Sequence, residues 1–300
     1  MSIYVENLIR APIEKIWNLT QTPELHEQWD LRFSHIEYLP RDSATELQRF
    51  RYTTRIGFGL QVKGEGESVG ERNLADGSRS SALKFSSTDP RSIILEGSGY
   101  WKYVPNAEGI RFITWYEYRT RFGAFGSAFD RFIFQPLMGW ATAWSFDRLR
   151  FWLEKDLNPK DAAQHAFIHG IARAGLAFVF IYHGLVPKLL GPHADEIAML
   201  RAAGFPGEKI AGALALLGVA EIILGLCFLI FPFRRWPIFV ALGVLLAATI
   251  VVLVSAPQYL VAAFNPISLN LAVAGLAIID LIAITRTPSA ARCRRKPAPS

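Results

Sequence analysis

The chain has 300 residues, 51% of them hydrophobic, and a net charge of +6. Residues 1–160 hold 21 basic and 20 acidic residues, and residues 161–300 hold 11 and 6, so most of the excess lies in the second half. Because this charge flanks apolar runs and fills the C-terminal tail, it is typical of membrane orientation, and we exclude nucleic acid as a partner. The two cysteines, Cys227 and Cys293, exclude a disulfide framework and a Cys-x-x-Cys redox pair.

The first half shows the periodicity of a soluble α+β domain. Its start has no basic stretch followed by an apolar run, so no signal peptide is expected. Alternation predicts a strand over residues 3–9, and Pro12 and Pro23 suit the first turns of two short helices, over residues 11–17 and 22–29. Period-two patterns then predict six strands, over residues 33–39, 47–56, 60–69, 80–87, 93–104 and 110–122. Their short connections predict an antiparallel meander.

A long helix is expected to close this domain. Apolar and aromatic residues recur at helical spacing over residues 125–153, and Pro136, which lacks a backbone donor, predicts a bend. The order strand, two helices, six strands, long helix resembles the helix-grip fold of the START-like, polyketide cyclase/dehydrase-type superfamily called SRPBCC. The resemblance rests on the segments APIEKIWNLTQTPELHEQWD and WSFDRLRFWLEK and covers residues 1–157. It implies a curved sheet wrapped on the last helix, around a cavity for hydrophobic small molecules.

The strand periodicity predicts which side chains line such a cavity. Alternation along residues 110–122 places Tyr116 and Tyr118 on the inward face, and the same argument turns Phe50, Tyr52 and Phe85 inward. We predict these five as ligand-binding residues, because tyrosines on an apolar wall suit a pocket that needs a few hydrogen bonds. The alternative is that they fill a core.

Catalytic residues cannot be assigned from the sequence. Only His26 and His35 lie in the first half, and no Ser/His/Asp or Cys/His grouping can be assembled around them. The residues therefore favour a binding domain over an enzyme. Neither a metal site nor a required cofactor is predicted.

A polar junction separates this domain from a membrane half. Residues 154–161 are polar and contain Pro159, which marks a domain boundary. Four apolar runs follow, over residues 167–190, 210–231, 237–256 and 266–285, each of about the 20 residues needed to cross a bilayer. We therefore predict an all-α bundle of four transmembrane helices over residues 166–285 and a basic tail over residues 286–300.

A motif in the first apolar run indicates a family. The segment YHGLVPKLL, residues 182–190, resembles the first span of the DoxX-like membrane proteins. Some relatives of that family belong to quinone-linked or thiol-oxidation systems. Cys227 stands alone in its run, which disfavours thiol exchange and leaves quinone binding open. His165 and His169 have a helical metal-ligand spacing, but without an acidic or cysteine partner nearby we expect two interfacial histidines.

Polar groups inside the apolar runs are further candidate functional residues, because such groups are costly in a bilayer and tend to face a bundle interior. Alternating span direction places Arg173, Glu221 and Asp280 toward one side and His183, Lys188 and Asn270 toward the other. We predict a charge pair between Arg173 and Glu221, with Asp280 as the competing partner. The alternative for Arg173 and Asp280 is snorkelling to the interface.

Together these expectations describe a membrane-tethered binding protein. Its helix-grip domain holds a hydrophobic small molecule or lipid, and its DoxX-like bundle anchors that domain in the cell (inner) membrane. The alternative is an enzyme, either cyclase/dehydratase-like or a quinone-linked membrane oxidoreductase. Basic residues beside the spans, with an uncharged loop over residues 256–265, predict that both termini are cytoplasmic. Formation of a homo-oligomer is left open.

Overall fold

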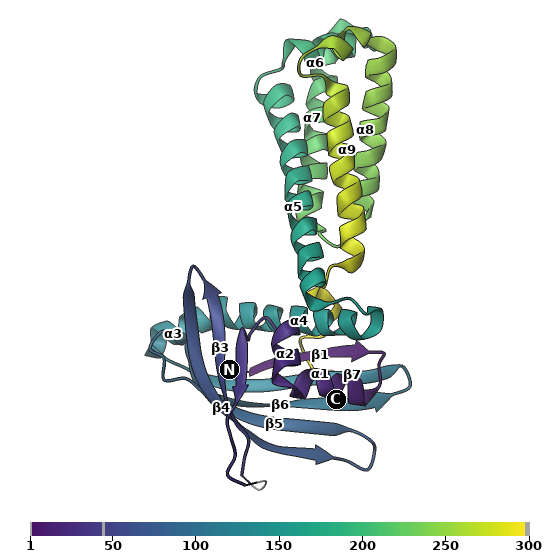
Figure 1. The fold of residues 1–300 in the computed structure, drawn as a ribbon. Coiled ribbons are helices and arrows are strands. Elements are labelled where there is room, and N and C mark those ends of the chain that lie inside the picture. The colour runs from purple at the N-terminus through teal and green to yellow at the C-terminus, as the bar shows by residue number, and fades with distance from the viewer. Residues whose placement is uncertain (1, 44–45, 298–300) are drawn as a thin grey trace. The chain divides into compact units, whose positions relative to one another are not determined.

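The computed structural model describes residues 2–43 and 46–297. They form two compact units, the first made of Met1–Ala163 with Pro288–Ser300 and the second of Gln164–Thr287 (Figure 1). The C-terminal segment that the sequence predicts as a separate basic tail therefore belongs to the first unit.

The first unit is an antiparallel sheet with helices. Its elements are β1 (Ser2–Ile9), α1 (Ile13–Gln21), α2 (Pro23–Trp29), β2 (His35–Tyr38), β3 (Arg49–Gly57), β4 (Leu60–Asn73), β5 (Arg79–Ser86), β6 (Ile94–Asn106), β7 (Gly109–Thr120), α3 (Gly123–Phe129), η1 (Asp130–Phe134), α4 (Gln135–Lys155) and η5 (Ala290–Arg292). The strand order is β1-β7-β6-β5-β4-β3-β2, so β1 pairs with the last strand and the rest form a meander. This confirms the predicted α+β class, with the sheet packed on a long C-terminal helix.

The closing helix is interrupted where the sequence predicts a bend. A π-helical turn, η1, runs from Asp130 to Phe134 and leads directly into α4, in whose first turn Pro136 lies. Proline has no N–H to donate and its ring collides with the carbonyl four residues earlier, so the preceding turn widens. One expected helix is thus three consecutive segments, and α4 alone spans the sheet.

Three glycines allow aromatic rings to lie flat on the inner face of the sheet. Phe50 pairs with Gly66 and Tyr52 with Gly64 across β3 and β4, and Phe85 pairs with Gly97 across β5 and β6. A Cβ atom at any of these glycines would collide with the ring of its cross-strand partner. The glycines therefore fix the orientation of the predicted inward aromatic residues.

The tail completes the first unit by packing on α4 and on β1. The backbone N–H and C=O groups of Arg294 bond with those of Glu6, both at 2.9 Å, so the tail extends the sheet beyond β1. Asp147 of α4 is fully buried and accepts from the Ser289 N–H at 2.7 Å and from Arg292 at 2.8 Å. The backbone therefore connects the two units at two points, after Ala163 and after Thr287.

The second unit consists of helices that suit a bilayer. Its elements are α5 (Pro159–Gly184, which begins in the first unit), η2 (Leu185–Leu190), α6 (Ala194–Ala202), α7 (Gly207–Ile230), α8 (Trp236–Ser255), η3 (Pro257–Val261), α9 (Pro266–Ala283) and η4 (Ile284–Arg286). In the described part of the chain, four helices are long and apolar enough to cross a membrane, which confirms the four predicted spans. The sequence interpretation missed α6, which is short and only weakly amphipathic.

Small residues bring two of these helices close together. The Cβ atom of a larger residue at Gly184 would collide with the Gly218 carbonyl, and a Cβ atom at Gly218 would collide with the Gly184 carbonyl. One heptad along α7, Gly225 faces the Ala177 carbonyl in the same way. Close backbone approach of this kind is the usual basis of helix association in lipid.

Candidate functional site

The first unit contains a cavity of about 160 Å³ between the inner face of the sheet, α1, α2 and α4. Its walls are largely apolar and aromatic, and four of the five predicted ligand-binding residues line it: Phe50, Tyr52, Phe85 and Tyr116. The fifth, Tyr118, does not. It lies farther along β7, where its hydroxyl donates to Asp130 Oδ1 at 2.7 Å, and it borders a separate open hollow of about 760 Å³.

Burial raises the pKa of two tyrosines that line this cavity. It raises the pKa of Tyr52 to about 12. It also raises the pKa of Tyr116, a rise that the neighbouring Arg32 opposes. The Thr142 hydroxyl donates to the Met138 carbonyl at 2.8 Å, so Tyr116, 3.0 Å away, donates to Thr142 and keeps its lone pairs for another partner.

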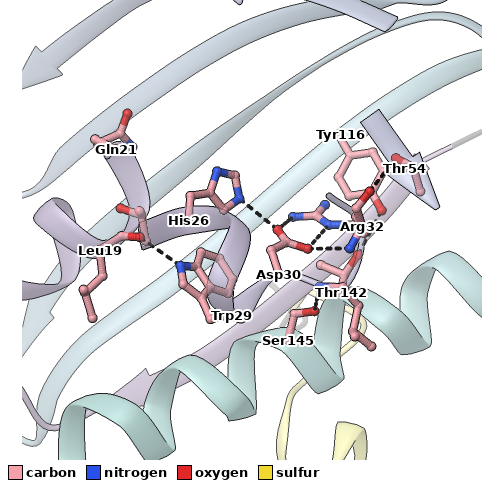
Figure 2. Close-up of polar contacts among 12 residues, drawn as sticks. Leu19, Gln21, His26, Trp29, Asp30, Arg32, Thr54, Tyr116, Thr142 and Ser145 are labelled. Atoms are coloured by element: carbon pink, nitrogen blue, oxygen red, sulfur yellow. Dashed lines mark hydrogen bonds and ion pairs between the residues drawn. The ribbon is translucent and has the colours of Figure 1, made fainter. Parts of the chain in front are cut away.

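A buried charged cluster of Asp30, Arg32 and His26, shown in Figure 2, borders the cavity. Asp30 follows the last residue of α2 and is 1% exposed. Its Oδ1 accepts from Arg32 Nε at 2.9 Å and its Oδ2 accepts from Arg32 Nη2 at 2.6 Å. His26, one helical turn before Asp30, places Nε2 3.0 Å from Oδ2. Of the three, His26 and Arg32 line the cavity.

Electrostatics keep Asp30 ionised. Burial acts to raise the pKa of this carboxyl group, but the Arg32 guanidinium and the hydrogen bond from His26 outweigh it and hold the pKa well below its usual range. Two further bonds fix the loop that carries Arg32. The Leu31 N–H donates to Ser145 of α4 at 2.9 Å, and Thr54 donates to the Arg32 carbonyl at 2.6 Å. The cluster is therefore held from α2, α4 and β3.

Sequence reasoning names His26 but misses this cluster. The spacing of His26 and Asp30, i and i+4 at the end of the predicted second helix, places both on one face and is a usable signal. The contribution of Arg32 has no such signal, because it depends on the path of the loop after Trp29.

Two ion-pair networks occur within the second unit. In the first, Asp280 of α9 is fully buried, its Oδ2 lies 2.6 Å from Arg173 Nε, and its Oδ1 lies 2.5 Å from His169 Nδ1. Arg173 also donates at 2.7 Å to the carbonyl of Arg234, which lies in the loop between α7 and α8. The predicted pair of Arg173 with Glu221 is therefore wrong, and the competing partner Asp280 is the one observed.

In the second network, Lys188 of η2 joins two carboxylates. Its Nζ lies 3.0 Å from Glu221 Oε2 and 3.0 Å from Glu196 Oε1 on α6. It also approaches the His183 carbonyl at 3.4 Å. Elsewhere Asn270 of α9 donates to Thr249 of α8 at 3.1 Å. Five of the six polar residues predicted in the apolar runs thus contact other polar groups of the second unit through their side chains, whereas His183 contributes its backbone carbonyl.

Comparisons with known proteins find a family for most of the second unit and a relative that matches 78% of this chain. A model of the DoxX-like family matches residues 177–278. The uncharacterized membrane protein YndG of Bacillus subtilis (strain 168) is 41% identical over 235 residues, which cover 78% of this chain and 79% of that protein.

Solved structures similar to this chain match about half of it. A STAR-related lipid transfer protein from Xanthomonas axonopodis is 15% identical, with a TM-score of 0.39 over 51% of this chain and 85% of that one. The di-domain ARO/CYC StfQ of the steffimycin biosynthetic pathway is 11% identical, with a TM-score of 0.40 over 52% of this chain and 50% of that one. The protein TTHA0849 from Thermus thermophilus is 20% identical, with a TM-score of 0.35 over 46% of this chain and 87% of that one.

The relationship to YndG extends over most of both chains. The residues that match the DoxX-like model, 177–278, lie in the segment that contains the four apolar helices. The chain is therefore a membrane protein with a DoxX-like domain, and it belongs to the family of Bacillus subtilis YndG.

Proposed function

We propose that the first unit binds a small apolar molecule in its cavity and that the DoxX-like bundle anchors this binding domain in the membrane. The observation that carries the proposal is the cavity itself, which combines an aromatic wall with polar groups that include His26, Arg32 and Tyr116. Ligand sites typically have this composition, with a few polar groups that fix the orientation of an apolar molecule.

The volume limits the ligand. Drug-sized sites have about 300–1,000 Å³, whereas an engineered apolar cavity of about 150 Å³ accepts benzene. At about 160 Å³ the cavity matches a compound of one or two rings with one hydrogen-bonding group. A whole lipid would require the sheet to move away from α4, so we favour the ring compound over a lipid.

A substitution that fills the cavity tests this proposal. Met138 of α4 lines the cavity and is only partly buried, so Met138→Trp should occupy the cavity and weaken binding of 2-naphthol by about tenfold or more, which is 1.4 kcal/mol per factor of ten. The matched control is Leu137→Trp, because Leu137 is exposed and does not line the cavity. Fluorescence titration of the full chain in lipid nanodiscs, with empty nanodiscs as reference, measures both. Equal binding by the two variants and the unaltered chain would refute a ligand in this cavity.

We further propose that both termini are cytoplasmic. Support comes from the basic residues beside the spans and from the even number of apolar helices. The bonds between Arg294 and Glu6 also support the proposal, because they join the first strand and the C-terminal segment in one unit. A reporter fused after Ser300 that is active only in the cytoplasm should be active. Activity of the opposite reporter, which functions only outside the cytoplasm, would reverse the orientation.

A further inference from the structure

We propose that the cavity is also a proton-transfer site, with His26 as the general base and an apolar ring compound that carries an acidic C–H bond as the substrate. The inference rests on the proposed function in one respect, because the substrate occupies the same cavity. It goes beyond binding because it assigns a reaction to residues that the binding proposal uses only for recognition.

The ionised Asp30 carboxylate fixes the tautomer of His26. An ionised carboxylate has no proton to donate, so in the 3.0 Å contact the imidazole Nε2 must be the donor. A neutral imidazole with a proton on Nε2 has a free lone pair on Nδ1. That nitrogen is turned away from Asp30 (Figure 2), and within residues 2–43 and 46–297 it has no hydrogen-bond partner.

Packing holds the imidazole ring in this orientation. Trp29 stacks on it with ring centroids 5.0 Å apart. Trp101 and Phe33 pack against it in T-shaped arrangements, with ring centroids 4.9 and 5.1 Å from that of the imidazole. His26 is 9% exposed and lines the cavity. A base that is fixed, mostly dry and directed by a carboxylate is the arrangement that general-base catalysis requires.

The charged groups at the cavity also suit proton transfer. When Nδ1 takes a proton from carbon, the C–H bond breaks and its electron pair moves onto the adjacent carbonyl oxygen, which gives an enolate and an imidazolium. Asp30 stabilises the imidazolium through Nε2–H. Arg32, which lines the same cavity with its guanidinium carbon 5.5 Å from the Tyr116 ring centroid, supplies positive charge for the enolate. Return of the proton to another carbon completes an isomerisation, with no oxidant or reductant.

A probe reaction tests the base without knowledge of the natural substrate. In 5-nitrobenzisoxazole a base removes the C3 proton, the N–O bond breaks, and the product is a coloured nitrile phenolate. The full chain in nanodiscs should catalyse this elimination, and His26→Gln should lower the rate by about a hundredfold, as expected for loss of a general base. His35→Gln is the matched control, because His35 is an exposed histidine of β2 that does not line the cavity.

Parallel measurements separate the two proposals. If His26→Gln lowers the elimination rate at saturating probe far more than it weakens 2-naphthol binding, the base is supported. If binding is retained and the rate does not change, the base is refuted while the binding function stands. If the unaltered chain binds no 2-naphthol, the binding function fails first.

Two further measurements need no variant. 2-Naphthol should inhibit the elimination competitively, and ¹⁵N NMR of labelled histidine should show His26 protonated on Nε2 only. A protein without any elimination rate above empty nanodiscs, or with His26 protonated on Nδ1, would overturn the proposal.

Discussion

Replacing Asp280 with asparagine should strongly destabilise the second unit. Asp280 is fully buried and has the guanidinium of Arg173 on one carboxylate oxygen and the His169 ring on the other. Removal of one partner of a buried ion pair typically costs about 3–5 kcal/mol, because the remaining charge is left uncompensated. Thermal unfolding of the full chain in mild detergent, followed by loss of helical circular dichroism, should show this loss as a lower midpoint.

A double-mutant cycle identifies the partner. Arg173→Met and Asp280→Asn together should cost less than the sum of the single changes, because the pair is removed jointly. Glu221→Gln provides the control, since Glu221 contacts Lys188 in the other network, and its effect should add to that of Arg173→Met. Additive losses for Arg173 and Asp280 would contradict the pair, and coupling of Arg173 to Glu221 would restore the pairing predicted from the sequence.

The erroneous pairing of Arg173 with Glu221 shows where sequence reasoning fails in this bundle. Alternating span direction assigns a polar residue to one side from its position along its own run, which assumes runs of similar length. The first helical run, Pro159–Leu190, has 32 residues and the second, Gly207–Ile230, has 24, so equal counts do not correspond to equal depths. In addition, η2 is a π-helical turn, which shifts the angular position of Lys188 on the helix.

The fold of the first unit was more predictable because strand alternation is local. Tyr116 and Phe85 are inward-facing in the sequence pattern and line the cavity in the structure. Tyr118 shares their face but lies at the position where η1 covers the sheet, and alternation cannot reveal how far a neighbouring helix extends. The charged cluster beside the cavity depends on the path of the loop that brings Arg32 to Asp30. No periodic pattern in the sequence encodes that path.

The tail was the least predictable element. Its bonds to β1 involve backbone groups of Arg294, which any residue except proline can supply, so the sequence pattern shows only a run of basic residues. Cys293 is buried in the same segment, and burial raises the pKa of its thiol, which remains protonated and donates to the Ala143 carbonyl at 3.2 Å. The charge of this segment therefore does not by itself indicate its structural role.

Asp147→Asn is expected to release this tail from the first unit. Asp147 is fully buried, and its two oxygens take Arg150 at 2.7 Å, Arg292 at 2.8 Å and the Ser289 N–H at 2.7 Å. Asparagine keeps the shape but loses the charge, so the two arginines lose their common counter-ion at a cost of up to about 3–5 kcal/mol. Limited proteolysis should cleave the tail faster in the variant, and the thermal midpoint should fall. Asp156→Asn is the matched control, because Asp156 is exposed at a left-handed position that asparagine also adopts.

The same contacts predict the behaviour of the first unit on its own. A fragment of residues 1–157 lacks the backbone pairing of Arg294 with Glu6 and the two tail groups that bond to Asp147. We expect it to melt at a lower temperature than the same fragment with residues 288–297 attached through a flexible linker. Addition of Asp147→Asn should remove most of the gain from the attached segment, because the linker then tethers a tail that no longer docks. If the attached segment raises the melting temperature equally with and without Asp147→Asn, the stabilisation comes from β1 pairing alone. If the segment has no effect in either background, the tail does not contribute to the stability of the first unit.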